Sequence, residues 1–399
     1  MFLDVLRRRN PALVEAAIAL HQAGRIPANC YVLDLDAVED NARAFKRRAD
    51  ALGLTVFAMT KQVGRNSGFC RALQRGGIDR AVAVDMACAR PIRAAGMRVG
   101  HLGHLVQVPR FEADAAARDV APDYWTVFSG AKASEAAAAG TRAGRTQKLL
   151  ARIHAPGDTF YRGHEGGFDA DDVAIVAADL DALGGARFAG ITTFPALLYD
   201  HETGSVAPTA NLATLGRARE ALERAGFTGI EVNAPGTTSS VVLQALADAG
   251  ATQCEPGNGL HGTTPLHAIR DLPEVPAMLY VTEVSHLHGG RACAFGGGLY
   301  IDPVFPDYQV RAIVAAEPTV ADAALANVEM PAPAAIDYYA MIDAGGRVRP
   351  APGDSVVFGF RAQAFVTRAY VAGVTGVRNG SPVVETLENG FGRAERWPA

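Results

Sequence analysis

The chain has 399 residues, of which 49% are hydrophobic and 20% are charged, and its formal net charge is −4. This composition is that of a globular protein long enough to bury a large core. The absence of a basic surplus argues against a nucleic acid partner. No apolar run approaches the ~20 residues that a membrane helix requires. Acidic and arginine residues interrupt the segment Met1–Arg9, where a secretory signal would need a longer apolar stretch, so we expect a cytoplasmic protein.

The cysteines do not form a recognisable framework. Cys30, Cys70, Cys88, Cys254 and Cys293 are scattered, odd in number and without a Cys-x-x-Cys spacing. We therefore expect neither a disulfide framework nor a structural zinc site.

The first part of the chain predicts a helix followed by a strand and a second helix. Residues Pro11–Ala23 have helical spacing of apolar residues. Tyr31–Leu35 reads as the first strand, and Asp36 is a candidate cap for a helix near Ala37–Ala51. Gly53 then ends that helix.

An apolar run that ends at Lys61 is the first sign of chemistry. Residues Thr55–Met59 read as a strand buried on both faces, where a cation is tolerated only at the end. In a (β/α)8 barrel the carboxyl ends of the strands form the floor of the active site. A partly desolvated lysine there would have a lowered pKa and could form a Schiff base. A solvated lysine just past the strand is the alternative.

Strands and alanine-rich helices then alternate with short connections, which predicts parallel βαβ units. The pattern spans about the ~250 residues of a closed barrel, so the predicted fold is a (β/α)8 TIM-type barrel. The further strands are expected at 81–84, 99–108, 125–128, 149–153, 188–192 and 229–233.

After about residue 273 the pattern changes to short β runs separated by Gly, Pro and Asp, which predicts a mostly-β domain. The predicted runs are 278–284, 292–301, 311–315, 355–360 and 364–371. The predicted domains are an N-terminal helical segment (1–24), the barrel (25–272) and a C-terminal β domain (273–399).

Two glycine-containing segments could bind a phosphate. Glu255–Gly262 contains a Gly-x-Gly-x-x-Gly pattern, but it lies late in the βα series and leads into a proline, so a dinucleotide site is a weak interpretation. The backbone amides of Gly257 and Asn258 could instead cradle a phosphate. The second segment follows the strand that ends at Asn233, and it offers a glycine and hydroxyls beside a helix start. Its candidate residues are Asn233, Gly236, Thr237, Thr238 and Ser239. A simple helix cap is the alternative for these hydroxyls.

Together these segments suit pyridoxal phosphate. Lys61 supplies an amine for the aldehyde, the two loops supply donors for the phosphate, and Glu255 can bind the ring nitrogen.

The combination of Thr60-Lys61-Gln62, the βα series, Glu255-Pro256-Gly257 and the trailing β domain resembles the fold-type III pyridoxal phosphate enzymes, which comprise the alanine racemase and basic amino-acid decarboxylase group. The segments 60–66 and 277–286 are especially similar to the YhfX-like proteins within it. The resemblance implies a Schiff base at Lys61, an amino-acid substrate, and a homodimer in which the partner's β domain completes each active site.

The chain departs from that family at three positions. Glu255 stands where racemases usually have arginine, which implies a protonated pyridine nitrogen and a stronger electron sink. Asn258 stands where decarboxylases have arginine. Thr193 replaces a histidine that both branches place near the ring.

The second acid or base that racemisation requires is expected from the β domain. Cys293 and Tyr300 are the candidates, although each is more often a packing residue. His104 is expected to line the barrel mouth beside the cofactor. The pairs His101-x-x-His104 and His286-x-His288 could bind a metal, but no further ligand has a suitable spacing, so no metal is predicted.

The sequence therefore predicts a pyridoxal phosphate enzyme acting at Cα of an amino acid, with racemase or epimerase activity ranked first. An amino-acid decarboxylase, a D-amino-acid lyase, a non-catalytic cofactor carrier and a lysine-dependent aldolase on an unrelated barrel are the alternatives. Arg65, Arg291 and Arg361 could each bind a substrate carboxylate, and no spacing selects among them.

Overall fold

The computed structural model describes residues 1–300, 302–305, 307–318, 324–345 and 347–397. It divides into two compact units that alternate along the chain. The barrel unit consists of Arg43–Thr60 and Gly77–Gly257, and the β unit of Met1–Ala42, Lys61–Gly76 and Asn258–Ala399. This division does not follow the consecutive segments 1–24, 25–272 and 273–399, and those boundaries stay a prediction. None of the described helices has the length and apolar character needed to span a membrane.

The barrel unit is a parallel sheet that closes on itself, which confirms the predicted fold. Its strand order is β2-β13-β12-β9-β7-β6-β5-β4-β3, and every neighbouring pair is parallel. β2 (Thr55–Val56) pairs with β13 (Gln253–Cys254), whereas β3 (Ala58–Met59) pairs with β4 (Arg80–Ala83). β2 and β3 are therefore two halves of one strand, interrupted at Phe57, and the barrel has eight strands. The other strands are β5 (Arg98–Leu102), β6 (Tyr124–Val127), β7 (Gln147–His154), β9 (Ala186–Thr192) and β12 (Glu231–Asn233).

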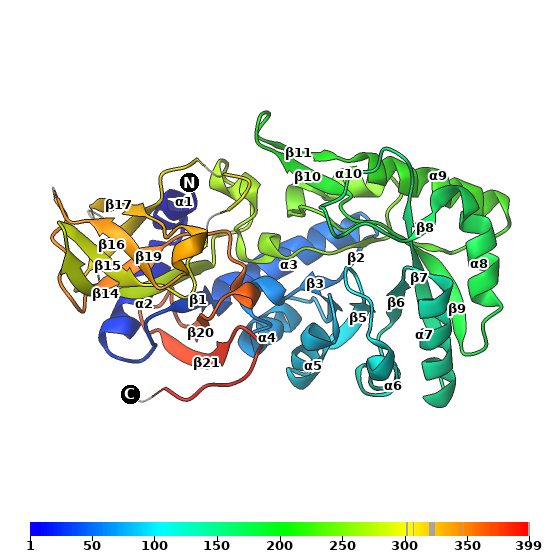
Figure 1. Cartoon of the computed structure of the whole chain (residues 1–399), viewed down its shortest axis with the longest axis horizontal. Coiled ribbons are helices and arrows are strands. Elements are labelled where there is room, and N and C mark those ends of the chain that lie inside the picture. Colours follow the sequence, from blue (N-terminus) through cyan, green and yellow to red (C-terminus); the bar gives the residue numbers. More distant parts are fainter. Residues whose placement is uncertain (301, 306, 319–323, 346, 398–399) are drawn as a thin grey trace. The chain divides into compact units, whose positions relative to one another are not determined.

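Helices follow the strands and cover the outside of the sheet (Figure 1). Side-chain caps fix several of their starts: Asp85 accepts a hydrogen bond from Cys88 N, and Ser129 accepts one from Lys132 N. The helices of this unit are α5 (Met86–Ala94), α6 (Ala113–Ala115), α7 (Gly130–Arg142), α8 (Val173–Asp181), α9 (Ala210–Arg224) and α10 (Leu243–Asp248). A short strand, β8 (Phe168–Asp169), and a hairpin of β10 (Leu197–Asp200) and β11 (Ser205–Pro208) lie in the connections after β7 and β9.

The β unit contains a nine-stranded sheet in the order β15-β18-β17-β16-β19-β14-β1-β20-β21, with β14 also pairing with β15. The strands are β1 (Cys30–Asp34), β14 (Met278–His288), β15 (Arg291–Phe295), β16 (Arg311–Ala315), β17 (Leu325–Glu329), β18 (Tyr339–Asp343), β19 (Ser355–Phe358), β20 (Tyr370–Thr375) and β21 (Val383–Asn389). Among its described residues, the α-helices that belong to it wholly or in part are α1 (Phe2–Arg9), α2 (Pro11–Gln22), α3 (Leu35–Ala51) and α4 (Ser67–Arg75).

Two expectations for the first strand and helix are wrong in detail. β1 does not begin the barrel, because it pairs with β14 and β20 in the β unit. The cap of α3 is Asp34, which accepts a hydrogen bond from Ala37 N at 3.0 Å, whereas the carboxylate of Asp36 binds Gly376 N. An acidic residue near the start of a helix can accept a hydrogen bond from the helix itself or from a distant backbone N–H. The sequence does not show which of the two it binds.

The predicted β runs of the second half are partly confirmed. The run 311–315 coincides with β16, and 278–284 is the first part of β14. In the run 292–301 only the portion up to Phe295 is strand, and residue 301 lies outside the described residues. Most of the run 364–371 precedes β20, while β17, β18 and β21 were not predicted.

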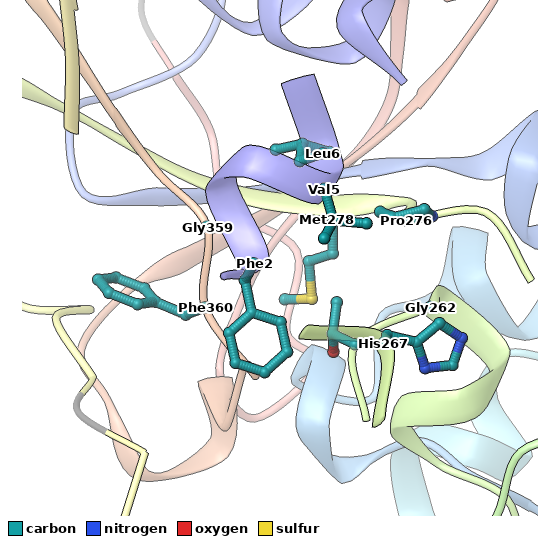
Figure 2. Close-up of a pocket in the computed structure, with 10 residues that line it drawn as sticks. Phe2, Val5, Leu6, Gly262, His267, Pro276, Met278, Gly359 and Phe360 are labelled. Atoms are coloured by element: carbon teal, nitrogen blue, oxygen red, sulfur yellow. The ribbon is translucent and has the colours of Figure 1, made fainter. Parts of the chain in front are cut away.

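The helix α1 packs its apolar face on the β unit. Phe2, Val5 and Leu6 are buried and, with Met278 and Phe360, line a cavity of about 10 Å³ (Figure 2). That volume is about the space that one water molecule needs, so side chains fill nearly all of the space around the start of α1.

The segment 261–267 contains two buried histidines, of which His267 lines this cavity. His261 is 0% exposed, and its Nδ1 lies 3.0 Å from Thr263 Oγ1. His267, which is drawn in Figure 2, pairs in the same way with Thr264 at 2.7 Å. Burial lowers the pKa of His261 to about 3 from its usual 6.5, and the neighbouring His267 adds to the effect. His261 is therefore neutral in the folded protein.

We expect this histidine to make the fold acid-sensitive. The unfolded chain binds a proton at His261 near pH 6.5, whereas the folded chain binds it only near pH 3. The neutral ring therefore contributes its full stabilisation above pH 6.5. Below that pH the free energy of unfolding falls by up to about 1.4 kcal/mol per pH unit. Denaturant unfolding between pH 7 and pH 3.5 should show a shallower acid slope for His261→Asn, which keeps a group that can bind Thr263. The exposed His201→Asn is the control, and an unchanged slope in His261→Asn would contradict the assignment.

Candidate active site

The carboxyl ends of the barrel strands carry a buried polar cluster centred on Glu255, which directly follows β13. The side chain of Glu255 is 1% exposed. Its Oε1 lies 2.5 Å from His101 Nδ1 and accepts a second hydrogen bond from Asn233 Nδ2 at 2.9 Å. Its Oε2 lies 2.9 Å from His104 Nδ1, but no hydrogen bond of acceptable geometry reaches that oxygen from the described residues. Oε1 therefore has two hydrogen-bond partners, while Oε2 can still accept a hydrogen bond.

The histidines keep this buried carboxylate ionised. Burial alone would raise the pKa of Glu255, but the charges of His104 and His101 and the hydrogen bond with His101 outweigh it. The net result is a pKa well below the usual 4.5. A buried anion of this kind persists only where donors compensate for the lost water.

A second layer of hydrogen bonds orients these donors. Thr192 Oγ1 donates to Asn233 Oδ1 at 2.7 Å, which leaves the amide nitrogen of Asn233 directed at Glu255. The other ring nitrogen of His101 lies 2.5 Å from Thr126 Oγ1. The members come from five different strands or strand ends, so the closed barrel is what brings them together.

His101, His104 and Glu255 also form the one group in the described chain whose spacing would suit a metal ion. Both nitrogens of His101 are occupied, one by Glu255 and the other by Thr126. A metal ion would have to displace Glu255 or Thr126 from His101. The two histidines are therefore better placed to stabilise the carboxylate of Glu255 than to bind a metal ion.

Arg152, near the end of β7, is a cation that the sequence analysis missed. It is 0% exposed. Its Nη2 donates to His164 O at 2.6 Å and lies 3.5 Å from Phe194 O. Its guanidinium lies over the ring of Phe128 at 4.8 Å. Nε and Nη1 have no hydrogen-bond partner among the described residues, and burial lowers the pKa of Arg152 to about 10.

The signal for Arg152 was present in the sequence. It lies in Leu149-Leu150-Ala151-Arg152-Ile153, a cation within an apolar strand, as Lys61 is at the end of one. Arg152 is therefore as recognisable a candidate in the sequence as Lys61.

Arg152 and Glu255 are connected through a ring contact. The rings of His104 and Phe194 lie 5.2 Å apart, edge to face, and the carbonyl of Phe194 faces Arg152. His104 therefore lies in this cluster. Thr193, the residue in the place of the family histidine, is buried with its hydroxyl 3.3 Å from Asn211 Nδ2.

The loop after β12 contains the predicted phosphate-binding residues. Gly236 lies so close to the backbone of Leu197 that a Cβ would be 2.6 Å from its nitrogen. Thr237 N donates to Leu197 O, and Thr238 Oγ1 donates to Gly236 O, each at 2.9 Å. Ser239 makes no side-chain cap to the following turn. The hydroxyl of Ser239 is therefore not used in a helix cap, whereas the backbone N–H of Thr237 already donates to Leu197 O.

The remaining candidates at strand ends are Lys61, Gly257 and Asn258. Lys61 begins a 3-10 turn (Lys61–Val63) two residues after β3, and its Nζ lies 5.2 Å from the ring centre of Phe365. Gly257 ends the barrel unit, and Asn258 begins the next turn of the chain. The side chain of Asn258 donates to Thr263 Oγ1 at 3.2 Å.

The candidates on the β unit occupy different environments. Cys293, in β15, is a free, half-buried thiol, and Tyr300 is also half-buried. Arg361 forms a two-point ion pair with Asp302, and Arg291 pairs with Glu329. These two arginines are thus already neutralised within the chain. Arg65 donates to Gly390 O at 2.7 Å.

Comparisons with known proteins place the chain in context. Residues 33–265 match the family model described as "Alanine racemase, N-terminal domain", and residues 279–384 match "YhfX-like, C-terminal domain". The uncharacterized protein YhfX of Escherichia coli (strain K12) is 37% identical over 396 residues, which cover 98% of this chain and 100% of that protein.

Several solved structures share the fold. D-threonine aldolase from Filomicrobium marinum matches with a TM-score of 0.68 at 18% identity, over 93% of this chain and 96% of that one. D-threo-3-hydroxyaspartate dehydratase from Delftia sp. HT23 matches with a TM-score of 0.64 at 18% identity, over 91% and 97%. Alanine racemase from Clostridium difficile 630 matches with a TM-score of 0.62 at 14% identity, over 92% and 99%. At such identities the likeness shows the fold alone.

We expect Glu255→Gln to destabilise the barrel, because it leaves two histidines beside a neutral amide. Removing one member of a buried ion pair costs about 3–5 kcal/mol in the free energy of unfolding. Since the folded carboxyl titrates below 4.5, its contribution is present above that pH and is lost as the pH falls further. Urea unfolding at pH 7 measures the loss. Glu135→Gln, which weakens the pairs of a half-buried surface carboxylate with Lys132 and Arg110, should cost no more than about 1 kcal/mol. Equal losses in both variants would contradict the role of Glu255.

Proposed function

Because the chain belongs to the family of proteins with an alanine racemase N-terminal domain, joined here to a YhfX-like C-terminal domain, we propose that it is a pyridoxal phosphate enzyme that acts at Cα of an amino acid. The observation that carries the proposal is Glu255, a buried, ionised carboxylate with one oxygen still able to accept a hydrogen bond. A protonated pyridine nitrogen is a suitable partner for that oxygen.

The described residues fit this cofactor at several points. Glu255 would hold the ring nitrogen, and the loop Gly236–Ser239 would hold the phosphate, where the glycine permits close backbone approach. Thr60 Oγ1 is buried and has no hydrogen-bond partner among the described residues, next to the lysine that would supply the amine. Gly257, Asn258, Asn233 and His104 complete the set that we assign to cofactor binding.

Each residue has a defined task in the proposed reaction. The cofactor, when bound, supplies an electron sink for the charge left at Cα. Glu255 keeps the ring nitrogen protonated, and His101, Asn233 and His104 keep Glu255 ionised. Lys61 would bind the aldehyde of the cofactor, and its amine would hold the proton that is moved at one face of Cα.

Racemase or epimerase activity is the specific reaction that we propose, with the family model of alanine racemase as its support. Such a reaction needs an acid or base on the opposite face of Cα. We assign this to Cys293 or Tyr300, provided by a second copy of the chain in a cytoplasmic homodimer. The decarboxylase and D-amino-acid lyase reactions remain alternatives on the same fold.

The first test is an absorbance spectrum of the purified full-length protein. We expect a visible band that borohydride removes, because a lysine-bound cofactor absorbs in the visible range and is trapped by reduction. Lys61→Ala should lack the band, whereas the control Lys132→Ala, on the surface of α7, should keep it. A colourless protein that takes up no added cofactor would rule out the proposed function and favour the aldolase alternative.

The second test asks which bond at Cα is broken. Incubation of the holoenzyme with a panel of D- and L-amino acids in deuterated water should give deuterium at Cα, detected by NMR, because racemisation exchanges that proton with solvent. Release of carbon dioxide without racemisation would identify a decarboxylase, and activity abolished by a chelator would identify the lyase. Tight reversible cofactor transfer with no exchange would identify a carrier.

A further inference from the structure

The barrel unit has a cavity at the amino ends of its strands, with a volume of about 340 Å³. Sites for small molecules usually enclose about 300–1,000 Å³. The cavity is lined by residues at the starts of β6, β7, β9 and β12, by the end of α8 and by the loop 227–230. Glu255 lies beyond the opposite, carboxyl ends of the strands, where the active sites of such barrels are found. The cavity is therefore separate from the candidate active site.

We propose that this cavity is a binding site for a zwitterionic small molecule of the α-amino-acid class. Lys148 and Arg187 would bind its carboxylate. Asp181 and Glu231 would bind its ammonium group, and Phe227 would contact its apolar part. None of these residues takes part in the proposed cofactor chemistry, so the site can be tested independently of that proposal.

Cationic and anionic side chains line the cavity without forming ion pairs with one another. Asp181 and Glu231 are part of the lining, yet neither Lys148 nor Arg187 forms an ion pair with a carboxylate of the described chain. A simple anion would engage the two cations and leave the two carboxylates without a partner, and a simple cation would do the reverse. A zwitterion supplies charge-assisted hydrogen bonds to both pairs at once. The charge pattern therefore favours an amino acid.

The sheet holds the two cations side by side. Lys148 pairs in register with Arg187 on β9 and with Tyr124 on β6. Its Nζ lies 5.1 Å from the centre of the Tyr124 ring, and this ring face stabilises the ammonium group. Neighbouring strands are about 4.8 Å apart, so both cations can reach one carboxylate. The guanidinium also matches the two oxygens of a carboxylate.

Hydrogen bonds within the barrel unit orient the two acidic side chains. Glu231 Oε1 accepts from the hydroxyl of Tyr124 at 2.7 Å, and its Oε2 accepts from Thr252 Oγ1 at 2.6 Å. Burial and the hydrogen bond with Glu231 raise the pKa of Tyr124, so the phenol keeps the proton that it donates. Asp181 Oδ1 accepts from Phe188 N at 2.6 Å. A carboxylate has about four acceptor positions, so both side chains can also accept from an ammonium group.

Aromatic and aliphatic side chains provide a surface for the rest of the ligand. The rings of Phe188 and Phe227 lie 5.7 Å apart, edge to face. Phe188 is buried, whereas Phe227 and Ile230 are half-buried in the lining of the cavity. An amino acid with an apolar side chain could therefore bury part of it against Phe227.

The test uses isothermal titration calorimetry on the purified full-length protein. The probes are N,N-dimethyl derivatives of L-phenylalanine, L-leucine and L-alanine, because a tertiary amine keeps the zwitterion but cannot form a Schiff base with a bound aldehyde. The matched probes are 3-phenylpropionate, which lacks the ammonium group, and N,N-dimethylphenethylamine, which lacks the carboxylate. We expect at least one of the zwitterions to bind at least about tenfold more tightly than either singly charged probe.

Four variants assign that binding to the cavity. Arg187→Met and Asp181→Asn should each weaken the binding of the zwitterion by at least about tenfold, since each removes one charge-assisted partner. The amide oxygen of Asp181→Asn can still accept from Phe188 N, so the variant should keep its fold, which thermal unfolding checks. The matched controls are Arg93→Met on α5 and Asp179→Asn on α8, two exposed residues outside the lining of the cavity. Both should bind as the wild type does.

Three results would overturn the proposal. The first is the absence of binding by all three zwitterions, and the second is binding that Arg187→Met and Asp181→Asn leave unchanged. The third is binding of 3-phenylpropionate as tight as that of the zwitterion, which would show an anion site instead. A protein that takes up no pyridoxal phosphate would contradict the proposed function but would leave all three measurements valid.

Discussion

The ionised carboxylate of Glu255 is the constraint around which the candidate site is arranged. Inside a protein, an uncompensated carboxylate takes up a proton and loses its charge. Glu255 avoids this because His101 and Asn233 donate to one oxygen while His104 lies beside the other. Those donors are in turn fixed by Thr126 and Thr192, so the charge state of one residue depends on most of the barrel's carboxyl end.

Closure of the barrel is what makes that arrangement possible. The partners lie far apart in the chain, since His101 and Glu255 are separated by 154 positions in the sequence. They meet because the strand Thr55–Met59 pairs on one side with β13 and on the other with β4, so the first and last barrel strands become neighbours. Lys61 follows the same closing strand after Thr60. The strand that completes the barrel therefore also carries the amine of the proposed chemistry.

Much of this could be read from the sequence, because it depends on local patterns. The buried strand before Lys61, the alternation of strands and helices and the change of pattern after residue 273 predicted the barrel and the β domain. Glu255 was marked by its place in a motif. What could not be read depends on pairing over long distances. β1 has the apolar composition of a barrel strand, and only its pairing with β14 and β20 assigns it to the β unit.

The same limit applies within the site. The sequence shows His101 and His104 three positions apart, a spacing that suits a metal, but not that Glu255 stands between them. Arg152 is the opposite case, since its position in an apolar strand was visible and only its lack of a carboxylate partner required the structure. Glu255 and Arg152 are an anion and a cation buried near the carboxyl ends of the barrel strands. Histidines and an amide stabilise Glu255, whereas carbonyl oxygens and aromatic faces are the described contacts of Arg152.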